Sequence, residues 1–548
     1  MLEYIQMGIP SYFSHIIRNY SNIIRSLKYF QNGSVNIEHL FMDCNSIVYD
    51  IVRSIEFTED KGVFEDLVIE SIIEKIKMYI DYIQPTKSIF IAFDGVAPFA
   101  KMEQQRTRRH KTLFMNNIDF DNKPDKVKTW DTSAITPGTD FMDKLSQRLN
   151  YAFSYTNNIY GVDEINVSAS CEPGEGEHKL FDYLRKNDLS LDNIALYGLD
   201  SDLIMLSIFH INQCKNIYIF REAPEFVKNM LPIGTVTDNN EPYFLDIELL
   251  SSSIIEDMHC CDRDIYRVYD YVFLCFLLGN DFLPHFPAMN IRTHGISVLL
   301  DVYTKTVGNV PNNFIITSNF TINWKNLRKV LTNIAKDETK YLLEEYSKRK
   351  RFDSYKYPES TREEKERLFQ NVPTIYRSQE TYISPENEFW ESRYYKTLFK
   401  QEPNDDFLKT VSINYIEGLE WVFKYYTTGC ISWRWKYDYI YPPLFKDLIK
   451  FIPHFEMDFV KPDSLGPFHP YTQLSYVLPL DNHFLLPDKI SKFLKYNYND
   501  CYASDYKFEW AFCRYFWESH PVLPDIPLKL LEKWDTQIQM FVQADAKN

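Results

Sequence analysis

Seven acidic residues in this sequence stand where predicted strands and helices would bring carboxylates together. Three predicted strands, within LFMD, FIAFD and ALYGLDSD, end in aspartate, and in open parallel α/β sheets such strand ends share the edge at which ligands bind. EPGEGEH (172–178) places two glutamates at a helix start, and LGNDFLP places an aspartate in a turn after an apolar run. The seven residues are Asp43, Asp94, Glu175, Glu177, Asp200, Asp202 and Asp281.

Such a set of acids predicts metal-dependent phosphoryl chemistry. Two carboxylates ~4 Å apart repel by roughly 4 kcal/mol at an effective dielectric near 20, so a converging cluster needs counter-charge. Mg²⁺ or Mn²⁺ would supply it, and two such ions about 4 Å apart activate a water and stabilise the leaving oxygen in phosphodiester cleavage. Helix caps and turns are the alternative roles for single acids, but they do not explain a convergence of seven.

A basic helix is predicted in GVAPFAKMEQQRTRRHK, directly after Asp94. Residues 101–111 carry five positive charges and one negative. On a helix, positions i, i+4, i+7 and i+8 share one face, and a lysine, an amide and two arginines on that face predict a receptor for a phosphate group. The alternative is a basic helix exposed to solvent. The four residues are Lys101, Gln105, Arg108 and Arg109.

Short apolar runs alternate with helical patterns over the first 300 residues, which predicts an α/β fold with a largely parallel central sheet flanked by helices. We expect a crossover helix at 65–83. The expected strands are 39–42, 88–93, 193–198 and 216–220.

Three regions are predicted along the chain. Residues 1–320 form the α/β unit, 321–385 a charged helical connector, and 386–548 an aromatic-rich block that packs on the first unit. The basic cluster Lys348–Arg351 is read either as the tail of a charged helix or as a nuclear signal.

The composition is that of a soluble globular protein and excludes a collagenous or disordered chain, because 45% of residues are apolar and 39 Tyr, 40 Phe and 9 Trp must be buried. The net charge of −16 argues against a general nucleic-acid coat. The apolar run 271–278 is too short for a membrane span, and the first residues predict a folded helix start rather than a signal or transit peptide. Nine cysteines without a C-x-x-C pair predict reduced thiols and no zinc site, as in a cytosolic or nuclear protein.

Together these motifs resemble the Xrn-type 5′→3′ exoribonuclease family, which is related to flap endonucleases and PIN-like nucleases. The resemblance covers about 7–320 and 386–535. In the family's order, the motifs are MGIPSYF (7–13), FMDCNSIVYD, FDGVAPFAKMEQQRTRRH, EPGEGEHKLFDYLR, YGLDSDLIML and FLLGNDFLP, followed by NYIEGLEWVFKYYTTGCISWRWKYDYIYPP (414–443) and PYTQLSYVLPLDNHFLLP (470–487).

The resemblance implies an Xrn N-terminal nuclease domain at 1–320 with a PIN/flap-nuclease-like core, and a second conserved block at 386–548. It also implies that the seven acids carry two magnesium ions and that the basic helix face binds an RNA 5′-monophosphate. Processivity follows, because each cut regenerates a 5′-phosphate. Pro98, and the segment after MGIP, are similar to elements that crowd out duplexes.

The sequence departs from the family pattern at several places. Tyr49 replaces a histidine that stacks on the 5′ base, and an aromatic ring can keep that role. Its stacking partner is predicted to be Trp433, with Trp435 second and core packing as the alternative for both. Ile440 replaces another histidine. Six residues precede Met7, and the long C-terminal extension of large members is absent.

The sequence therefore predicts a processive exoribonuclease that hydrolyses 5′-monophosphorylated single-stranded RNA to nucleoside monophosphates by two-metal-ion catalysis. The alternatives are a structure-specific 5′-flap endonuclease and a nuclease-dead RNA-binding scaffold. We expect a cytoplasmic monomer without membrane contact, for which the decapping machinery is a candidate partner.

Overall fold

The computed structural model describes residues 11–545, except 34, 59, 119–128, 199, 224–230, 232–240 and 504. Met7 to Pro10 of the MGIPSYF motif and the six residues before Met7 lie outside the described residues.

A seven-stranded sheet forms the centre of the N-terminal half, in the order β1-β7-β6-β5-β2-β3-β4. The strands from β6 to β4 in that order pair in parallel, whereas β7 runs antiparallel to both of its neighbours. The predicted largely parallel central sheet flanked by helices is confirmed. The strands are β1 (Ile24–Ser26), β2 (His39–Asp43), β3 (Ser88–Ala92), β4 (Glu164–Ser168), β5 (Leu189–Tyr197), β6 (Cys214–Glu222) and β7 (Pro242–Asp246).

Alternating side chains of each central strand enter two different cores. In β2, Phe41 packs in one hydrophobic cluster, whereas Leu40 and Met42 pack in the other. The neighbouring β5 follows the same rule, with Leu196 in the first cluster and Tyr197 in the second. Because successive strand residues point to opposite faces, a strand that is apolar at every position must be covered on both sides.

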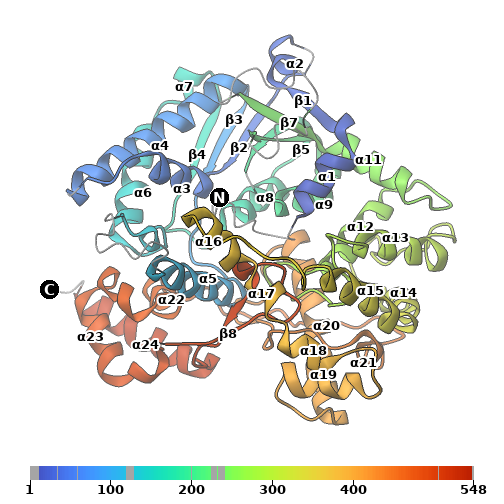
Figure 1. Cartoon of the computed structure of the whole chain (residues 1–548). Coiled ribbons are helices and arrows are strands. Elements are labelled where there is room, and N and C mark those ends of the chain that lie inside the picture. The colour runs from blue at the N-terminus through green and yellow to red at the C-terminus, as the bar shows by residue number, and fades with distance from the viewer. Residues whose placement is uncertain are drawn as a thin grey trace.

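Helices cover both faces of the sheet. The predicted crossover helix begins earlier than expected, because the Asp60 side chain caps it by accepting hydrogen bonds from the Gly62 and Val63 N–H groups. One face carries α3 (Asn45–Ser54), α4 (Lys61–Ile83) and α6 (Asp140–Phe153); the other carries α1 (Tyr12–Asn19), α8 (Gly176–Lys186), α9 (Asp202–His210), α11 (Ile247–Asp257) and α12 (Tyr266–Cys275). Figure 1 shows α3 and α4 on one side of the strands and α8 and α9 on the other.

The predicted basic helix is α5 (Phe99–Asn117), which begins directly after Pro98. It lies between the sheet and the C-terminal helices and packs closely against α22 (Pro470–Val477). Phe99 and Met102 enter a third hydrophobic cluster together with residues of α22 and α24 (Leu528–Asp545). This packing of Phe99 and Met102 fixes which side of α5 carries the polar residues.

The second block packs on the sheet unit. Its longest helix, α20 (Asp405–Thr427), contacts α9, and its buried Trp421 and Val422 belong to the same cluster as Phe41 of the sheet. In Figure 1 the orange and red helices lie below the strands. The remaining helices and strands of this block are α19 (Trp390–Leu398), α21 (Phe445–Leu448), α23 (Asp488–Asn497), β8 (Phe508–Glu509) and β9 (His520–Pro521).

The charged region 321–385 folds into several helices. The expected helical connector is interrupted at Asp337, and the helix before this residue buries Leu327, Leu331 and Ile334 in the main core. This region is therefore packed along an apolar stripe, although its outer face is charged. Its helices are α14 (Trp324–Lys336), α15 (Glu338–Lys350), α16 (Arg362–Gln370), α17 (Val372–Ile375) and α18 (Ser378–Ile383). The boundaries at 320 and 385 stay predictions.

The basic cluster at 348–351 ends helix α15, and its central residue is not available as a linear signal. Arg349 is buried and bonds to both carboxylate oxygens of Glu380, at 2.8 and 2.7 Å. Lys350 pairs with Glu386 at 2.7 Å. These contacts favour the helix-tail interpretation.

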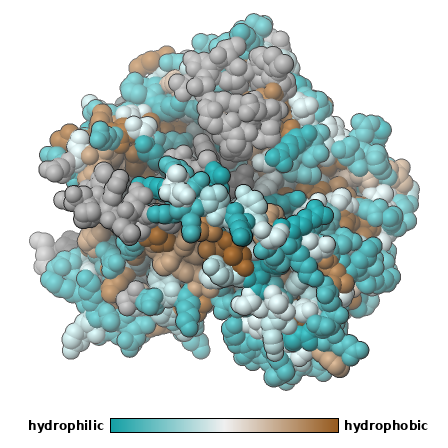
Figure 2. Space-filling model, in the orientation of Figure 1, coloured by the Kyte–Doolittle hydropathy of each residue, from teal (hydrophilic) through white to brown (hydrophobic). Residues whose placement is uncertain are grey.

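The surface shown in Figure 2 is largely hydrophilic, with hydrophobic residues gathered in a band below its centre.

All nine cysteines are free thiols. Across the part of the chain that the structure describes, no helix combines the length and apolarity needed to cross a membrane. The remaining α-helices of the described residues are α2 (Leu27–Gln31), α7 (Asn157–Tyr160) and α13 (Gly295–Thr306).

Candidate active site

Six of the seven predicted acids lie at the carboxyl edge of four adjacent strands. Asp43 is the last residue of β2, and Asp94 follows β3 by two residues. The loop after β4 leads into the first turn of α8, and the loop after β5 leads into α9, so each brings two acids to the same edge. Asp281 follows from α12 on the other side of the site.

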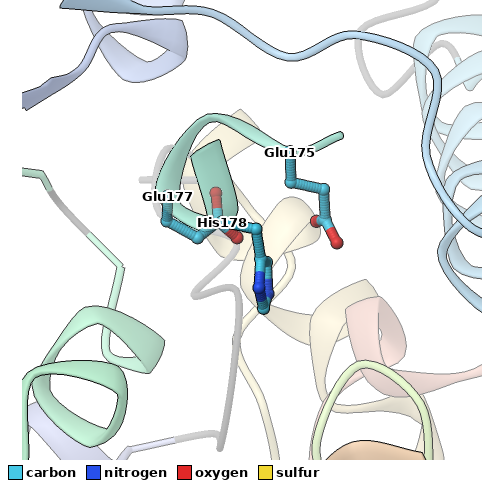
Figure 3. Close-up of side chains that lie close together, drawn as sticks. All are labelled: Glu175, Glu177 and His178. Atoms are coloured by element: carbon cyan, nitrogen blue, oxygen red, sulfur yellow. The ribbon is translucent and has the colours of Figure 1, made fainter. Parts of the chain in front are cut away.

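Two sets of ligand atoms in this cluster are close enough to share a cation. One carboxylate oxygen each from Asp43, Asp94 and Glu177 lie within 4.8 Å of one another, and so do atoms of Glu175, Glu177 and His178. Figure 3 shows the three side chains at the start of α8, with the His178 ring between the two carboxylates. His178 was not anticipated from the sequence, because one histidine beside acids carries no distinguishing signal.

Gly176 permits this close approach. Its N–H donates to Asp94 Oδ1 at 2.7 Å, and a Cβ atom at this position would lie 2.5 Å from Asp43 Oδ1. Any larger residue would therefore displace an acid. Glu175, although it stands at the N-cap position of α8, makes no side-chain capping hydrogen bond, so a capping role does not account for it.

Burial and mutual repulsion make the ionised cluster costly. Burial first, and then neighbouring carboxylates, hold the pKa of Asp43, Glu177 and Asp202 well above the usual range. Burial likewise raises the pKa of Asp200 to about 6, although Lys101 opposes the shift. Asp94 is held by Asn45, whose amide donates to Asp94 Oδ2 and whose Oδ1 accepts from the Asp94 N–H at 3.1 Å.

Lys101 lies inside the acid cluster. Its Nζ is 2.5 Å from Glu175 Oε2 and 2.8 Å from Asp281 Oδ2. Burial lowers the lysine pKa, but Asp281 and Glu175 outweigh it and hold the pKa well above its usual value. Lys101 is thus a counter-charge for two acids, whereas its helix position predicted a place in the phosphate receptor.

The donor set fits hard divalent cations. Buried oxygens Asp43 Oδ1 and Asp202 Oδ1 have no hydrogen-bond partner among the described residues, which is costly unless a cation binds them. Carboxylate oxygens are the ligands that Mg²⁺ and Mn²⁺ prefer. Lys101 pairs with only two of the seven acids, so negative charge remains for such ions to neutralise.

A cavity of about 1300 Å³ opens beside the cluster. Asp94, Asp200 and Asp281 contribute to its wall, and α5 runs along it. Three of the four predicted phosphate-binding residues, Gln105, Arg108 and Arg109, line this cavity. Three of the acids and both arginines therefore face one space.

Arg109 and Tyr49 form a fixed part of that wall. The Arg109 guanidinium donates to the Thr132 and Ile135 carbonyl oxygens at 3.1 and 2.8 Å, and contacts the Tyr49 hydroxyl at 3.4 Å. Burial raises the pKa of the Tyr49 phenol, but the charges of Arg109 and Arg108 outweigh it and bring the pKa below its usual value. Gln105 accepts a hydrogen bond from Gln473 at 3.1 Å, so it too is held in place.

Two family models together match most of the chain. The model for the XRN 5′-3′ exonuclease N-terminus matches residues 7–223, and the model for the Xrn1 helical domain matches 263–387 and 382–540. The chain belongs to the Xrn family. The second model alone extends over half of the chain.

Curated Xrn relatives match over nearly the whole chain. The "5′-3′ exoribonuclease 2 homolog" of Drosophila melanogaster is 24% identical over 96% of this chain and 70% of its own length. The human "5′-3′ exoribonuclease 1" is 26% identical over 97% of this chain but only 34% of its own length. A solved structure of the catalytic core of Rad2 in complex with DNA substrate covers 62% of this chain and 79% of that chain at 16% identity, and its TM-score of 0.32 is too low to support a conclusion.

The Xrn resemblance assigned Trp433, Trp435 and Pro98 to contact with the substrate, but none of the three is among the residues that line the cavity. Trp433 and Trp435 are absent from its wall, and the Trp435 ring stacks on Trp421 at 5.1 Å in the core. Pro98 is buried where α5 begins, next to Trp433, whose carbonyl accepts from the Phe99 N–H at 3.1 Å.

Trp517 lines the cavity and was not anticipated. Lys111 of α5 donates to the Trp517 carbonyl at 2.5 Å, which attaches this segment to the same helix that carries Arg108. The sequence shows a tryptophan in FWESHPVLP, but its place beside α5 depends on packing between segments about 400 residues apart.

Proposed function

We propose that this protein is a processive 5′→3′ exoribonuclease that hydrolyses 5′-monophosphorylated single-stranded RNA to nucleoside monophosphates. One observation carries the proposal: three acids of the cluster, Asp94, Asp200 and Asp281, and the Arg108 face of α5 line the same cavity. Membership of the Xrn family, and relatives named 5′-3′ exoribonucleases, support it.

The seven acids are the residues that would hold two divalent cations, Mg²⁺ or Mn²⁺. Such ions lower the pKa of a bound water and stabilise charge on the leaving oxygen of a phosphodiester. The protein's own contribution is to fix the acids: Asn45 orients Asp94, Gly176 allows Asp43 close to α8, and Lys101 joins Glu175 to Asp281.

The 5′-monophosphate is proposed to bind at Gln105, Arg108 and Arg109. Arginine offers planar paired donors to phosphate oxygens, and Arg109 is held rigid by carbonyl groups. A 5′-hydroxyl lacks the charge to bind there, and we propose that a cap or triphosphate is excluded, as the Xrn resemblance implies. Each cleavage leaves a new 5′-phosphate, so the product strand remains a substrate.

Tyr49 is proposed to stack on the first base. Base–aromatic stacking contributes about 1–3 kcal/mol per base. Trp517, rather than Trp433, is proposed as its stacking partner, because Trp517 lines the cavity.

An enzyme with this requirement must act after a reaction that exposes a 5′-monophosphate. We therefore propose a cytoplasmic, monomeric protein in RNA degradation, including mRNA decay, with the decapping machinery as the class of partner that supplies its substrate.

The proposal is tested by degrading one RNA sequence with a 5′-monophosphate, 5′-triphosphate or 5′-hydroxyl end, with and without EDTA. We expect rapid release of nucleoside monophosphates from the monophosphate RNA only, and none in EDTA. Equal rates on all three ends would show that no pocket selects the 5′-monophosphate. Release of oligonucleotides from an internally labelled 5′-flap substrate would instead identify an endonuclease.

A further inference from the structure

Tyr425 of α20 contacts the acid cluster from the second block. Its hydroxyl donates to Glu175 Oε1 at 2.7 Å, across 250 residues of sequence. The side chain is 2% exposed. A buried hydroxyl without a partner is costly, and a phenylalanine would fill the same core without that cost. Its one hydrogen bond to a carboxylate therefore needs a functional reason.

The two partners of Glu175 bind its two oxygens separately. Lys101 Nζ lies 2.5 Å from Oε2, and Tyr425 occupies Oε1. With only the lysine, the carboxylate could still turn about its terminal bond, because that torsion is broad. The tyrosine removes this freedom and fixes the edge that Glu175 presents to Glu177 and the other acids.

The Tyr425 ring is itself fixed by packing. It stacks on His178 at 3.6 Å with an interplanar angle of 26°, and on Trp421 at 4.8 Å and 24°. Phe282, next to Asp281, packs its edge against the ring at 5.5 Å. The ring stack thus connects the first turn of α8, shown in Figure 3, with the core of the second block.

We infer that Tyr425 is a positioning residue of the acid cluster, which holds Glu175 and the first turn of α8 in the geometry that binds divalent cations. The inference rests on the proposed function in one respect, that the acids bind cations. It makes the second block part of the metal site, so the segment that carries the acids does not complete the site alone.

The test compares Tyr425→Phe with wild type in the full chain. Phenylalanine keeps the ring stack and removes only the hydroxyl. Mn²⁺ binding without RNA is measured by the loss of the free-ion EPR signal, and the Mg²⁺ concentration for half-maximal RNA cleavage is measured separately. Loss of a residue that hydrogen-bonds to a metal ligand typically lowers metal affinity by ~10–100-fold. We therefore expect the Mn²⁺ dissociation constant and the half-maximal Mg²⁺ concentration each to rise about tenfold, with the KM for RNA unchanged at saturating Mg²⁺.

Tyr415→Phe is the matched control. Tyr415 is a buried tyrosine of the same helix, and its hydroxyl donates to the Pro284 carbonyl at 3.0 Å. We expect it to leave Mn²⁺ affinity unchanged. Tyr425→Leu, which also removes the stack on His178, is expected to weaken Mn²⁺ binding further than Tyr425→Phe.

Wild-type Mn²⁺ affinity in a folded Tyr425→Phe protein would overturn the inference, and so would an equal loss in Tyr415→Phe. If wild type binds Mn²⁺ but does not degrade RNA, the proposed function fails, and the binding comparison still decides the role of Tyr425. If wild type binds no Mn²⁺, both are wrong.

Discussion

Single atoms decide how close the acids of this site come together. Asp43 and Asp94 meet the start of α8 at a position without a side chain, and the Gly176 N–H itself bonds to Asp94. Lys101 then joins Glu175 to Asp281. The geometry of the proposed metal site therefore depends on residues that are not themselves acids.

Gly176→Ala should disrupt the cluster without unfolding the protein. The new Cβ would lie 2.5 Å from Asp43 Oδ1, so this carboxylate must move. We expect Mn²⁺ affinity to fall about tenfold or more, as measured by EPR titration. Gly466→Ala is the control, because no atom lies within 4 Å of its Cβ. Equal affinity in both variants would contradict the described geometry.

Arg108→Ala should remove the selection for a 5′-monophosphate. Hydrogen bonds to charged groups contribute about 1.5–3 kcal/mol, so cleavage of 5′-monophosphate RNA should slow by ~10- to 100-fold. The slow rate on 5′-hydroxyl RNA should not change. Arg263→Ala, at an exposed pair with Glu256, provides the control. A parallel loss on both RNAs would mean that Arg108 acts on something other than the phosphate.

At the level of elements, the sequence was informative where burial is complete. The strands β2, β3, β5 and β6 are apolar along most of their length, and each was expected within a few residues. The edge strand β4 has the polar sequence EINVS and is only partly buried, so its pattern could not be distinguished from a loop.

The site residues also differ in how far the sequence could predict their positions. The convergence of the acids could be predicted, because strand order places their carboxyl ends on one edge. Helical spacing grouped Gln105, Arg108 and Arg109, which line one cavity, but it could not show that Lys101 turns towards the acids. The positions of Trp517 and Tyr425 depend on contacts between distant segments, which no local pattern records.

The packed stripe of α14 predicts a large stability effect in a region that reads as a charged connector. Leu331 is fully buried, so Leu331→Ala should lower the free energy of unfolding by about 2–5 kcal/mol in urea denaturation. Leu191→Ala, where the side chain is 84% exposed, should change it by less than about 0.5 kcal/mol. Equal stability of both variants would mean that α14 does not pack on the core.

The whole molecule carries −16, yet its proposed substrate is an anion. The acid cluster accounts for part of this charge, and the basic residues that matter are gathered along α5 and the cavity wall. An acidic total is thus compatible with RNA bound in a cavity rather than spread over the surface.

Salt dependence of RNA binding should reflect this confinement. For single strands, the slope of log affinity against log salt is roughly −0.7 for each phosphate contacted. We expect a shallow slope of about −1.5 to −3, measured by fluorescence anisotropy. The measurement uses the Asp202→Ala variant, so that the RNA is not degraded. Adding Arg108→Ala should reduce the magnitude of the slope by about 0.7. A steep slope would indicate binding over a broad basic surface.

The most direct test of the central claim is the single-turnover rate of nucleoside monophosphate release from 5′-monophosphate RNA at saturating Mg²⁺, for wild type and Asp202→Ala. Asp202 begins α9 at the carboxyl edge, and one of its oxygens is buried without a partner in the described structure. We expect the rate to fall by more than about 100-fold, because a buried ligand of the proposed cations is lost. An unchanged rate in the folded variant would show that the acid cluster is not the catalytic site.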